Sequence, residues 1–478
     1  MRSIRQCLPL LLLPLLLTTP VFAESLIGTL TVQWGDPHPD LDDPTVRRIM
    51  LTDDAGQHTE LTMSDELFRG GIFRWNGRRV EVLPPAGAAP REPGEAMRVG
   101  ALRLIGEESL GGTVSGSQPW ISILCKFADV ATEPENLAFF QNMYANTPGE
   151  LDHYWREVSY DHIDIVGSTA IDWVDLPDNH TDYVPTPGSN SDADLNTLFD
   201  DCTAAADPFV DFANGGTPFA GINMMFNDLL DCCAWGGSRF ATLDGVTKSW
   251  RTTWEPPWGY ANAGVIAHEM GHGFGLPHAN NWDADGNPYD SPWDVMSAAT
   301  SNSVFDSVYG SLGKHVNAYH KERLGWFEPA RQFTVTDEGS FPITLDHTAL
   351  ANSSNYQIAT IPIGDGSTWY TVEARQRTGE YEANLPGDAV IIHEVNPNRS
   401  EPSWAVDGAS PPADFGSNEG TMWKVGETFE DTANQISVRV DSETANGFRV
   451  TLISGNPSEI FFDGFESGDT TVWSSAQP

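Results

Sequence analysis

Residues 268–278, His-Glu-Met-Gly-His-Gly-Phe-Gly-Leu-Pro-His, constrain this chain more than any other stretch of its sequence. Side chains four residues apart lie on the same face of a helix, so His268 and His272 can direct two imidazoles at one metal ion. Gly275 can adopt the left-handed conformation that ends a helix, and the proline two residues later prevents the helix from continuing. The chain can therefore turn and bring His278 back as a third metal ligand.

Three protein ligands leave one coordination position of a tetrahedral zinc ion open. A water molecule bound at such a position has its pKa lowered toward ~7. Glu269 follows the first ligand directly, so its carboxyl group can take the proton of this water as a general base and pass it to a leaving amine. The motif therefore predicts a hydrolytic zinc centre with His268, His272 and His278 as the metal ligands and Glu269 as the catalytic residue.

The pattern H-E-x-x-H-x-x-G-x-x-H, followed by a turn that contains Met296, resembles the metzincin metalloproteases. The resemblance implies that Met296 forms a hydrophobic floor beneath the zinc ligands. Residues 154–160 and 317–326 look like the corresponding parts of the immune-inhibitor-A-type secreted bacterial metalloproteases, and gametolysin is a more distant relative. That group often has an acidic residue where this chain has His278, which makes the site itself closer to the broader metzincin pattern.

Some metzincins hold a tyrosine two residues after the methionine as a fifth ligand or oxyanion donor, but Ala298 stands at that position here. Tyr319 could assist an oxyanion, although packing or surface exposure is the competing interpretation. His162 is interpreted as a structural residue, because three histidines already account for the metal.

Residues 1–23 have the basic start, apolar core and small-residue cleavage site of a secretory signal peptide. The apolar run is too short to span a membrane, and no later segment is long and apolar enough to do so. We therefore expect a secreted mature chain that begins at Glu24 and has no stable membrane insertion.

The formal net charge of −41 argues against nucleic acid as a partner. It is compatible with calcium binding and with simple solubility of a secreted protein. Residues 283–290 alternate oxygen-bearing side chains around a glycine and resemble a short calcium loop. The full EF-hand spacing is absent and the same residues form ordinary turns, so both Ca²⁺ binding and a plain turn stay open.

Four cysteines lie beyond the signal peptide, and two disulfides between them allow three pairings. We favour a bridge from Cys202 to either Cys232 or Cys233, because these segments flank one loop-rich region. A vicinal Cys232–Cys233 bond is the strained alternative.

Residues 24–115 are predicted to be a small β domain or a propeptide, with strands near residues 26–34 and 47–51 and a hairpin over residues 71–83. Many metzincins are kept latent by a cysteine or aspartate of a prosegment that occupies the open zinc position. This segment contains no cysteine, so a cysteine switch within it is excluded. The resemblance leaves an aspartate such as Asp36 or Asp40 as a candidate.

Residues 116–328 are predicted to form a metzincin-like catalytic domain, with a twisted mixed sheet and the zinc-binding helix. The patterns that predict it are a buried strand over residues 120–127, a helix over 135–158 interrupted near 147–149, the catalytic helix over 262–274 and a helix over 311–324. Metzincins bind an extended substrate on an edge strand of this sheet, and residues 219–226 are the leading candidate for that strand.

Residues 329–455 contain short strands separated by turns, which predict a C-terminal β-sandwich. Residues 456–478 are an acidic and aromatic tail, interpreted as an export or processing tag or as a loosely docked end. The complete fold is therefore predicted as α+β, with a catalytic domain flanked by two β domains.

The sequence favours a secreted zinc-dependent endopeptidase that acts on protein or peptide substrates. The alternative is a catalytically silent secreted binding or adhesion protein on a metzincin scaffold. A zinc hydrolase acting on a non-protein substrate is less favoured, because the resemblance is to peptidases throughout.

Overall fold

The computed structural model describes residues 24–38, 45–68, 71–89, 91–92, 94–106, 113–282, 287–410, 412 and 418–455. The predicted signal peptide, the C-terminal tail, Asp40 and residues 283–286 of the calcium-like loop lie outside the described residues. The described chain is mixed α+β, with most strands gathered in several sheets and few helices, as the α+β prediction requires. Among the described residues, no helix has the length and apolar content needed to cross a membrane.

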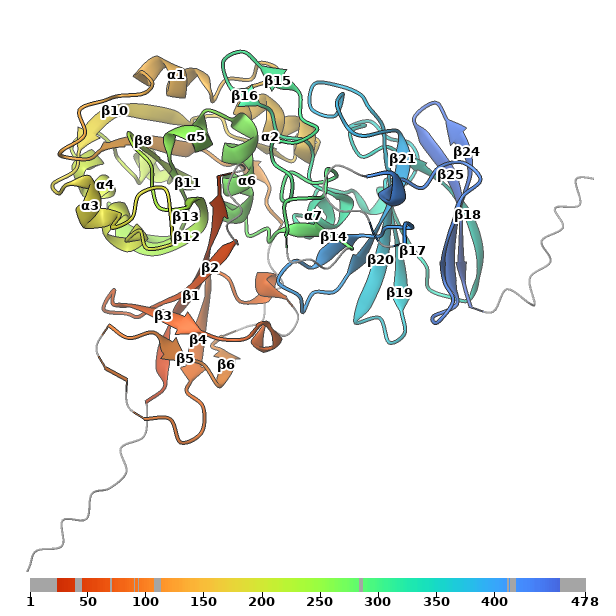
Figure 1. Ribbon diagram of the computed structural model, residues 1–478, viewed down its shortest axis with the longest axis horizontal. Helices are drawn as coiled ribbons and strands as arrows, with labels where there is room; N and C mark the ends of the chain where they lie inside the picture. The colour runs from red at the N-terminus through yellow and green to blue at the C-terminus, as the bar shows by residue number, and fades with distance from the viewer. Residues whose placement is uncertain are drawn as a thin grey trace, which may run out of the picture.

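A large sheet runs through the left half of the molecule in Figure 1, in the order β10-β8-β11-β13-β12-β1-β2-β3-β5. Its first five strands are β10 (Thr169–Asp175), β8 (Trp120–Lys126), β11 (Gly221–Phe226), β13 (Val246–Glu255) and β12 (Cys233–Leu243). The first four run parallel to one another, whereas β12 is antiparallel to β13. Strand β8 is almost continuously apolar, as expected for a parallel strand covered on both faces.

Strand β11 is not an edge strand, so the prediction for residues 219–226 is wrong. It pairs with β8 on one side and with β13 on the other. An apolar run buried on both faces shows that a strand is internal to the layers, but its neighbours within the sheet depend on long-range pairing. Of these five strands, β12 is the last in the order that starts at β10, and its other side is hydrogen-bonded to β1.

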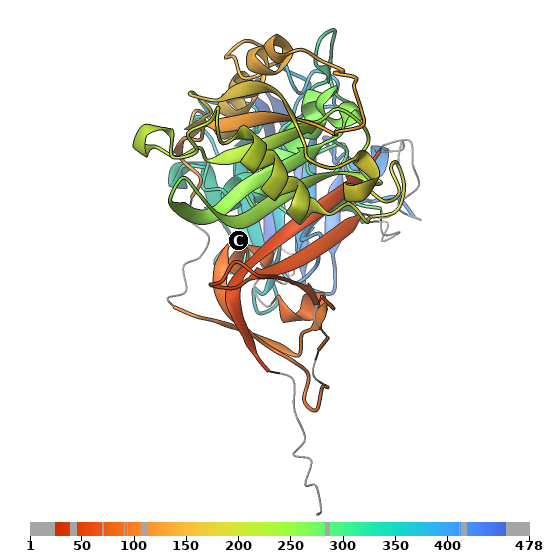
Figure 2. The same cartoon turned by 90° about the vertical axis from the view of Figure 1, so that its left-hand side faces the viewer.

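The N-terminal segment continues the same sheet, as the red and orange strands of Figure 2 show. Its strands are β1 (Leu26–Pro37), β2 (Val46–Thr52), β3 (His58–Thr62), β4 (Arg78–Leu83), β5 (Met97–Arg98) and β6 (Ala101–Leu104). The predicted hairpin over residues 71–83 is wrong, because Ile72–Arg74 is a 3-10 helix and β4 pairs with β1 and β6. Ile72 and Trp75 are buried in the core of this segment, which favours the compact turn over a first strand.

Helices cover both faces of the large sheet. The α-helices among the described residues are α1 (Leu137–Asn142), α2 (Leu151–Ser159), α3 (His180–Tyr183), α4 (Leu195–Ala206), α5 (Pro257–Tyr260), α6 (Ala263–Gly273) and α7 (Ala318–Arg323), of which α7 packs against the C-terminal part of the chain. Side chains of α2 and α6 share one core with Trp120 and Leu124 of β8, whereas α4 packs on the opposite face against Ile121 and Ile123. The predicted break between α1 and α2 is confirmed.

The predicted helix over residues 311–324 is correct only in its last part. Gly310–Ser311 is strand β16, which pairs with β15 (Phe305–Asp306), and helix α7 begins at Ala318. Asn317 caps α7 by accepting a hydrogen bond from the backbone N–H of His320. This local cap fixes where the helix starts, which the apolar pattern alone did not indicate.

The favoured disulfide is wrong as well. Cys202 of α4 pairs with Cys125 of β8, and Cys232 pairs with its neighbour Cys233. Cys125 and Cys202 face the same apolar core from the sheet and from the helix that covers it, although 77 residues separate them. Neighbourhood in the sequence does not indicate such a contact between a strand and the helix that covers it, so the prediction failed.

The C-terminal part consists of two sheets that share one core. The first has the order β14 (Ala279–Asn281), β22 (Ser403–Ala405), β21 (Ala389–Val395), β20 (Thr368–Arg375), β19 (Ile358–Ile363) and β17 (Gln332–Thr334). The second has the order β18 (Gly339–Asp346), β25 (Gly447–Ser454), β24 (Ile436–Thr444) and β23 (Thr428–Asp431). Val372, Val390, Val438 and Val450 meet between the sheets. Strand β14 directly follows His278, so the C-terminal part is joined to the candidate site.

A short parallel pairing also joins β7 (Gly116–Ser117) to β9 (Ile163–Asp164).

Candidate metal centre

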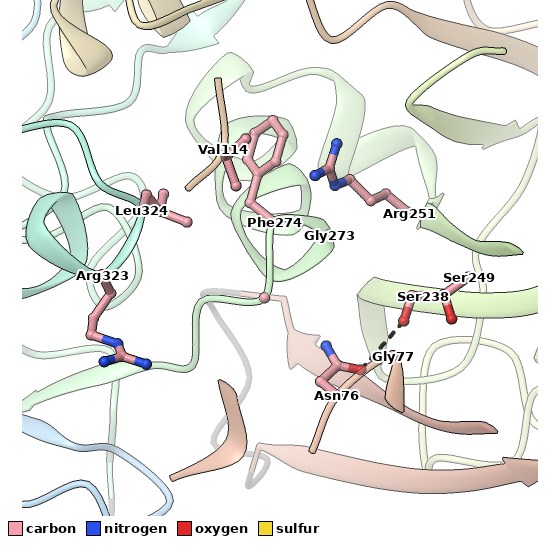
Figure 3. Close-up of a pocket in the computed structure, with 11 residues that line it drawn as sticks. Asn76, Gly77, Val114, Ser238, Ser249, Arg251, Gly273, Phe274, Arg323 and Leu324 are labelled. Atoms are coloured by element: carbon pink, nitrogen blue, oxygen red, sulfur yellow. Dashed lines mark hydrogen bonds between the residues drawn. The ribbon is translucent and has the colours of Figure 1, made fainter. Parts of the chain in front are cut away.

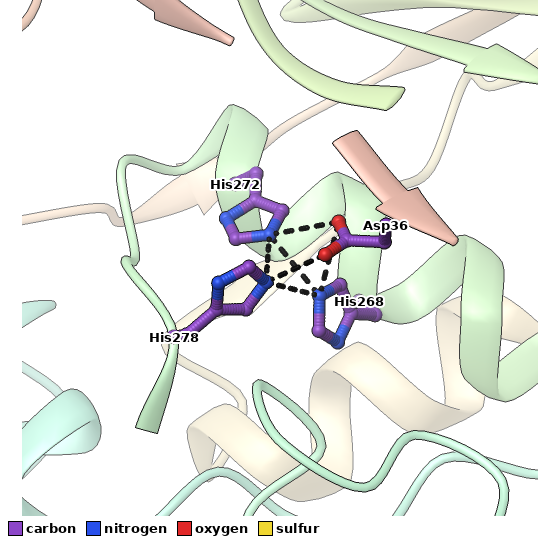
Figure 4. A group of neighbouring side chains, drawn as sticks. All are labelled: Asp36, His268, His272 and His278. Carbon is purple, nitrogen blue, oxygen red and sulfur yellow. Dashed lines mark hydrogen bonds and ion pairs between the residues drawn. The ribbon is translucent and has the colours of Figure 1, made fainter. Parts of the chain in front are cut away.

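Helix α6 presents His268 and His272 on one face, and His278 returns to them after the chain turns at Gly275 (Figure 4). Gly275 has a φ of 96°, the left-handed conformation expected of it. The Nε2 atoms of the three histidines lie 3.1–3.2 Å from one another. All three rings are almost completely buried. The structure therefore brings together the three residues that the motif selected.

Backbone carbonyls fix the orientation of two of these rings. His268 Nδ1 lies 2.7 Å from the carbonyl oxygen of Val295, and His272 Nδ1 lies 2.7 Å from that of Leu276. A carbonyl only accepts, so each Nδ1 carries the proton and each Nε2 directs a lone pair at the centre of the cluster. Burial lowers the pKa of His272 to about 3, which keeps this ring neutral. Lone pairs that converge in this way could hold a cation between them.

A fourth group completes the cluster. The carboxylate of Asp36, at the end of β1, places Oδ1 2.7 Å from His278 Nε2. Its Oδ2 lies 3.3 Å from His272 Nε2 and 3.4 Å from His268 Nε2. Burial opposes ionisation of Asp36, but the histidines hold its pKa well below the usual value. Three imidazole nitrogens and one carboxylate oxygen form a buried group that could hold a metal ion.

The pairing of β1 with β12 places Asp36 beside the histidines. Asp36 stands opposite Ala234 of β12, and the indole of Trp34 stacks on His272 with ring centroids 4.6 Å apart. Gly35 lies against Trp235, where a Cβ atom would come within 2.7 Å of the indole ring. A side chain at Gly35 would therefore push β1 away from β12. Asp36 was one candidate that the resemblance suggested, but the strand pairing that places it beside the histidines is visible only in the fold.

Glu269 is completely buried beside the cluster. Within the described residues, neither of its carboxyl oxygens makes a hydrogen bond of normal geometry. Burial raises the pKa of Glu269 well above its usual value, and the negative charges of Asp36 and Glu255 raise it further. Gly236 leaves room for the carboxyl group, since a Cβ there would lie 2.6 Å from Glu269 Oε2.

Met296 lies under helix α6, against Gly271. A Cβ atom on Gly271 would overlap Met296 Sδ, which explains why the helix has no side chain at that position. Asp294 holds the surrounding turn by accepting hydrogen bonds from the backbone N–H of Met296 at 2.7 Å and from that of Asn317 at 3.1 Å. His320 Nδ1 lies 2.7 Å from the same carboxylate.

Tyr289 is the site residue that the sequence analysis missed. Its hydroxyl donates a hydrogen bond to Asp36 Oδ1 at 2.6 Å. Tyr319, the candidate named instead, is buried against His320 and Trp369. The position of Tyr289 on the short connection between His278 and Met296 was the one sequence signal that could have suggested it. The sequence pattern does not indicate which way its side chain points. His162 lies in the turn between α2 and β9 and does not belong to the metal-ligand cluster.

A separate cavity of about 250 Å³ lies beyond the C-terminal end of α6 (Figure 3). Asn76 and Gly77 of the N-terminal segment line it together with Arg251 and Phe274. The hydroxyl of Ser238 in β12 donates a 3.4 Å hydrogen bond to Asn76 Oδ1 of the N-terminal segment. The lining contains none of the clustered histidines, so the cavity is not part of the metal centre.

Comparisons with protein-family models, with curated proteins and with solved structures found no significant match to this chain.

Proposed function

We propose that this chain is a secreted zinc-dependent endopeptidase that hydrolyses peptide bonds of extracellular proteins. His268, His272 and His278 would hold the zinc ion, and Glu269 would be the general base. The observation that carries the proposal is the convergence of three Nε2 atoms on one buried point beside a buried carboxyl group. Three protein ligands with one further position for water or substrate are the donor set of hydrolytic zinc enzymes.

Zinc bound at these residues would polarise the scissile carbonyl group and lower the pKa of the attacking water. Glu269, which is buried beside these histidines, would accept a proton from that water. As the general base, Glu269 would hold this proton until the leaving nitrogen accepts it. The hydrogen bonds from His268 and His272 to backbone carbonyls keep both rings oriented during the reaction.

The N-terminal segment supports a latent form of this enzyme. Strand β1 occupies the side of β12 on which an extended substrate would add, and Asp36 occupies the fourth position of the metal cluster. In this proposal, residues 24–115 are a prosegment. Removal of β1 would expose β12 and leave three histidines with an open position.

One observation favours the rival function, a secreted binding protein without turnover. Asp36 supplies a fourth protein ligand, and a closed set of four ligands is typical of structural zinc sites. The rival requires that β1 stays in place in the functional protein, whereas the endopeptidase requires that it leaves.

Casein hydrolysis by the purified full-length protein, measured before and after limited proteolysis, separates these functions. Zinc content is measured in every sample, and N-terminal sequencing locates the cut. We expect about one zinc per chain, no hydrolysis before the cut and hydrolysis after loss of β1. Glu269→Gln should bind zinc and remain inactive, whereas Glu328→Gln, which removes an exposed carboxyl group, should behave as wild type. A zinc-loaded wild type that has lost β1 and still does not cleave casein would contradict the proposal.

A further inference from the structure

We infer that Tyr289 is the oxyanion donor of this site, with its hydroxyl stabilising the scissile carbonyl oxygen as water adds to the peptide bond. The inference rests on the proposed endopeptidase and adds a catalytic residue outside the histidine motif. It also explains how a chain with Ala298 two residues after Met296 can supply a hydroxyl donor.

The geometry around Asp36 shows where the reacting oxygens would lie. Asp36 Oδ1 is 2.6 Å from the Tyr289 hydroxyl and 2.7 Å from His278 Nε2, so one oxygen faces both the phenol and a metal ligand. A carboxylate carries two oxygens on one carbon, as does the adduct of water with a peptide carbonyl. Asp36 therefore marks the positions that the two oxygens of this adduct would take once β1 has left.

Tyr289 is held in this orientation from both sides. Its backbone N–H donates to Asn287 Oδ1 at 3.0 Å, and the carbonyl of the next residue, Asp290, accepts from Asn281 Nδ2 at 3.2 Å. The ring lies edge-on to His278, with centroids 5.4 Å apart. A donor fixed before the reaction stabilises developing charge without the cost of reorganisation.

The step balances with the groups at the site. The water oxygen bonds to the carbonyl carbon, the π electron pair of the carbonyl moves to its oxygen, and the water proton passes to Glu269. Tyr289 keeps its proton and donates a hydrogen bond to the carbonyl oxygen. When the C–N bond breaks, the proton held by Glu269 goes to the nitrogen and the carbonyl reforms.

The first test compares wild type, Tyr289→Phe and Tyr319→Phe after limited proteolysis, with equal zinc content. We expect Tyr289→Phe to lower kcat by about 10²-fold, the loss typical of one oxyanion donor, with a much smaller change in KM. Its affinity for a phosphinic peptide, a tetrahedral analogue, should fall as well. Tyr319→Phe removes a buried hydroxyl from outside the metal-ligand cluster and should match wild type. Unchanged kcat and phosphinate affinity in Tyr289→Phe would overturn the inference.

A second test needs neither activation nor turnover, so it separates failure of this inference from failure of the proposed function. The full-length Asp36→Ala protein is loaded with Co²⁺ and titrated with acetate, a carboxylate small enough to replace the missing side chain, while the visible spectrum is recorded. Adding Tyr289→Phe should weaken acetate binding by at least ~10-fold, as loss of a hydrogen bond to a charged group predicts. Equal acetate affinity with and without Tyr289→Phe, or no acetate binding to Asp36→Ala, would overturn the inference even if the enzyme cleaves casein.

Discussion

Asp36 of the N-terminal segment contacts His278 of the candidate metal centre, with Asp36 Oδ1 2.7 Å from His278 Nε2. The two residues come from different parts of the chain, and the register of β1 on β12 brings them together. The same register places Trp34 on His272. Access to the histidine cluster and the integrity of the large sheet are therefore linked.

Asp36→Ala should make a bound metal ion easier to remove. The substitution deletes the carboxylate ligand while β1 keeps its backbone pairing with β12. We expect zinc transfer from the full-length protein to a chelator to accelerate by at least ~10-fold. Loss of a residue that only hydrogen-bonds to a metal ligand already weakens metal binding by about this factor, and Asp36 would be a ligand itself. Asp54→Ala is the matched control, because Asp54 pairs with Arg79 on the surface of the same segment. Equal rates in the two variants would show that Asp36 does not contact the metal.

Acidification should weaken the contact between β3 and β12. His58 Nδ1 accepts a hydrogen bond from Arg239 Nη1 at 3.0 Å, and burial together with the positive charge of Arg239 lowers the pKa of His58 to about 4. A folded-state pKa below the usual 6.5 means that the stabilisation is complete above pH 6.5 and is lost as pH falls toward 4.

The pH dependence of the unfolding temperature tests this contact. His58→Gln should flatten part of the decline between pH 6.5 and 4, since glutamine gains no charge in that window. His162→Gln removes an imidazole from the turn between α2 and β9, away from this contact, and is the control for the loss of a histidine. The prediction fails if the difference in unfolding temperature between wild type and His58→Gln is constant across this range.

Arg375 should be essential for coupling the C-terminal part to the turn that holds Met296. Its guanidinium is completely buried, pairs with Glu382 and donates to the carbonyl oxygen of Trp293. Arg375→Met should reduce the free energy of unfolding by about 3–5 kcal/mol, because Glu382 is left buried without its partner. Arg377→Met removes a half-exposed ion pair with Asp388 and should cost less than about 1 kcal/mol. Similar denaturation midpoints and slopes for the two variants would contradict this role.

The Cys125–Cys202 disulfide should stabilise the fold far more than the vicinal one. It closes a loop with a sequence separation of 77, for which the chain-entropy model gives about 4.5 kcal/mol. Replacing both residues with alanine should lower the free energy of unfolding by roughly that amount in chemical denaturation. The pair Cys232 and Cys233 has a separation of 1, so its double alanine variant should change loop entropy little. Equal losses from the two double variants would refute this difference.

Local patterns were sufficient for some of this structure. The spacing of His268, His272 and His278 predicted a helix, a turn and three convergent imidazoles, and α6 and Gly275 have these conformations. Apolar patterns also predicted β8 and most strands of the C-terminal part, and the proline and glycine near residues 147–149 predicted the break between α1 and α2. These features depend on residues close together in the chain, where helix geometry and strand alternation fix the spacing.

Only the tertiary structure decided which groups surround the histidines. Asp36 reaches them through strand pairing, and Tyr289 reaches Asp36 through a loop whose direction no period indicates. The neighbours of β11 and the partner of Cys202 were predicted wrongly for the same reason. The sequence by itself determined the donor set, because three ligands lie within eleven residues of chain. The fold determined the fourth ligand and the nearby hydroxyl, because contacts between distant segments depend on sheet register and packing, which local sequence does not specify.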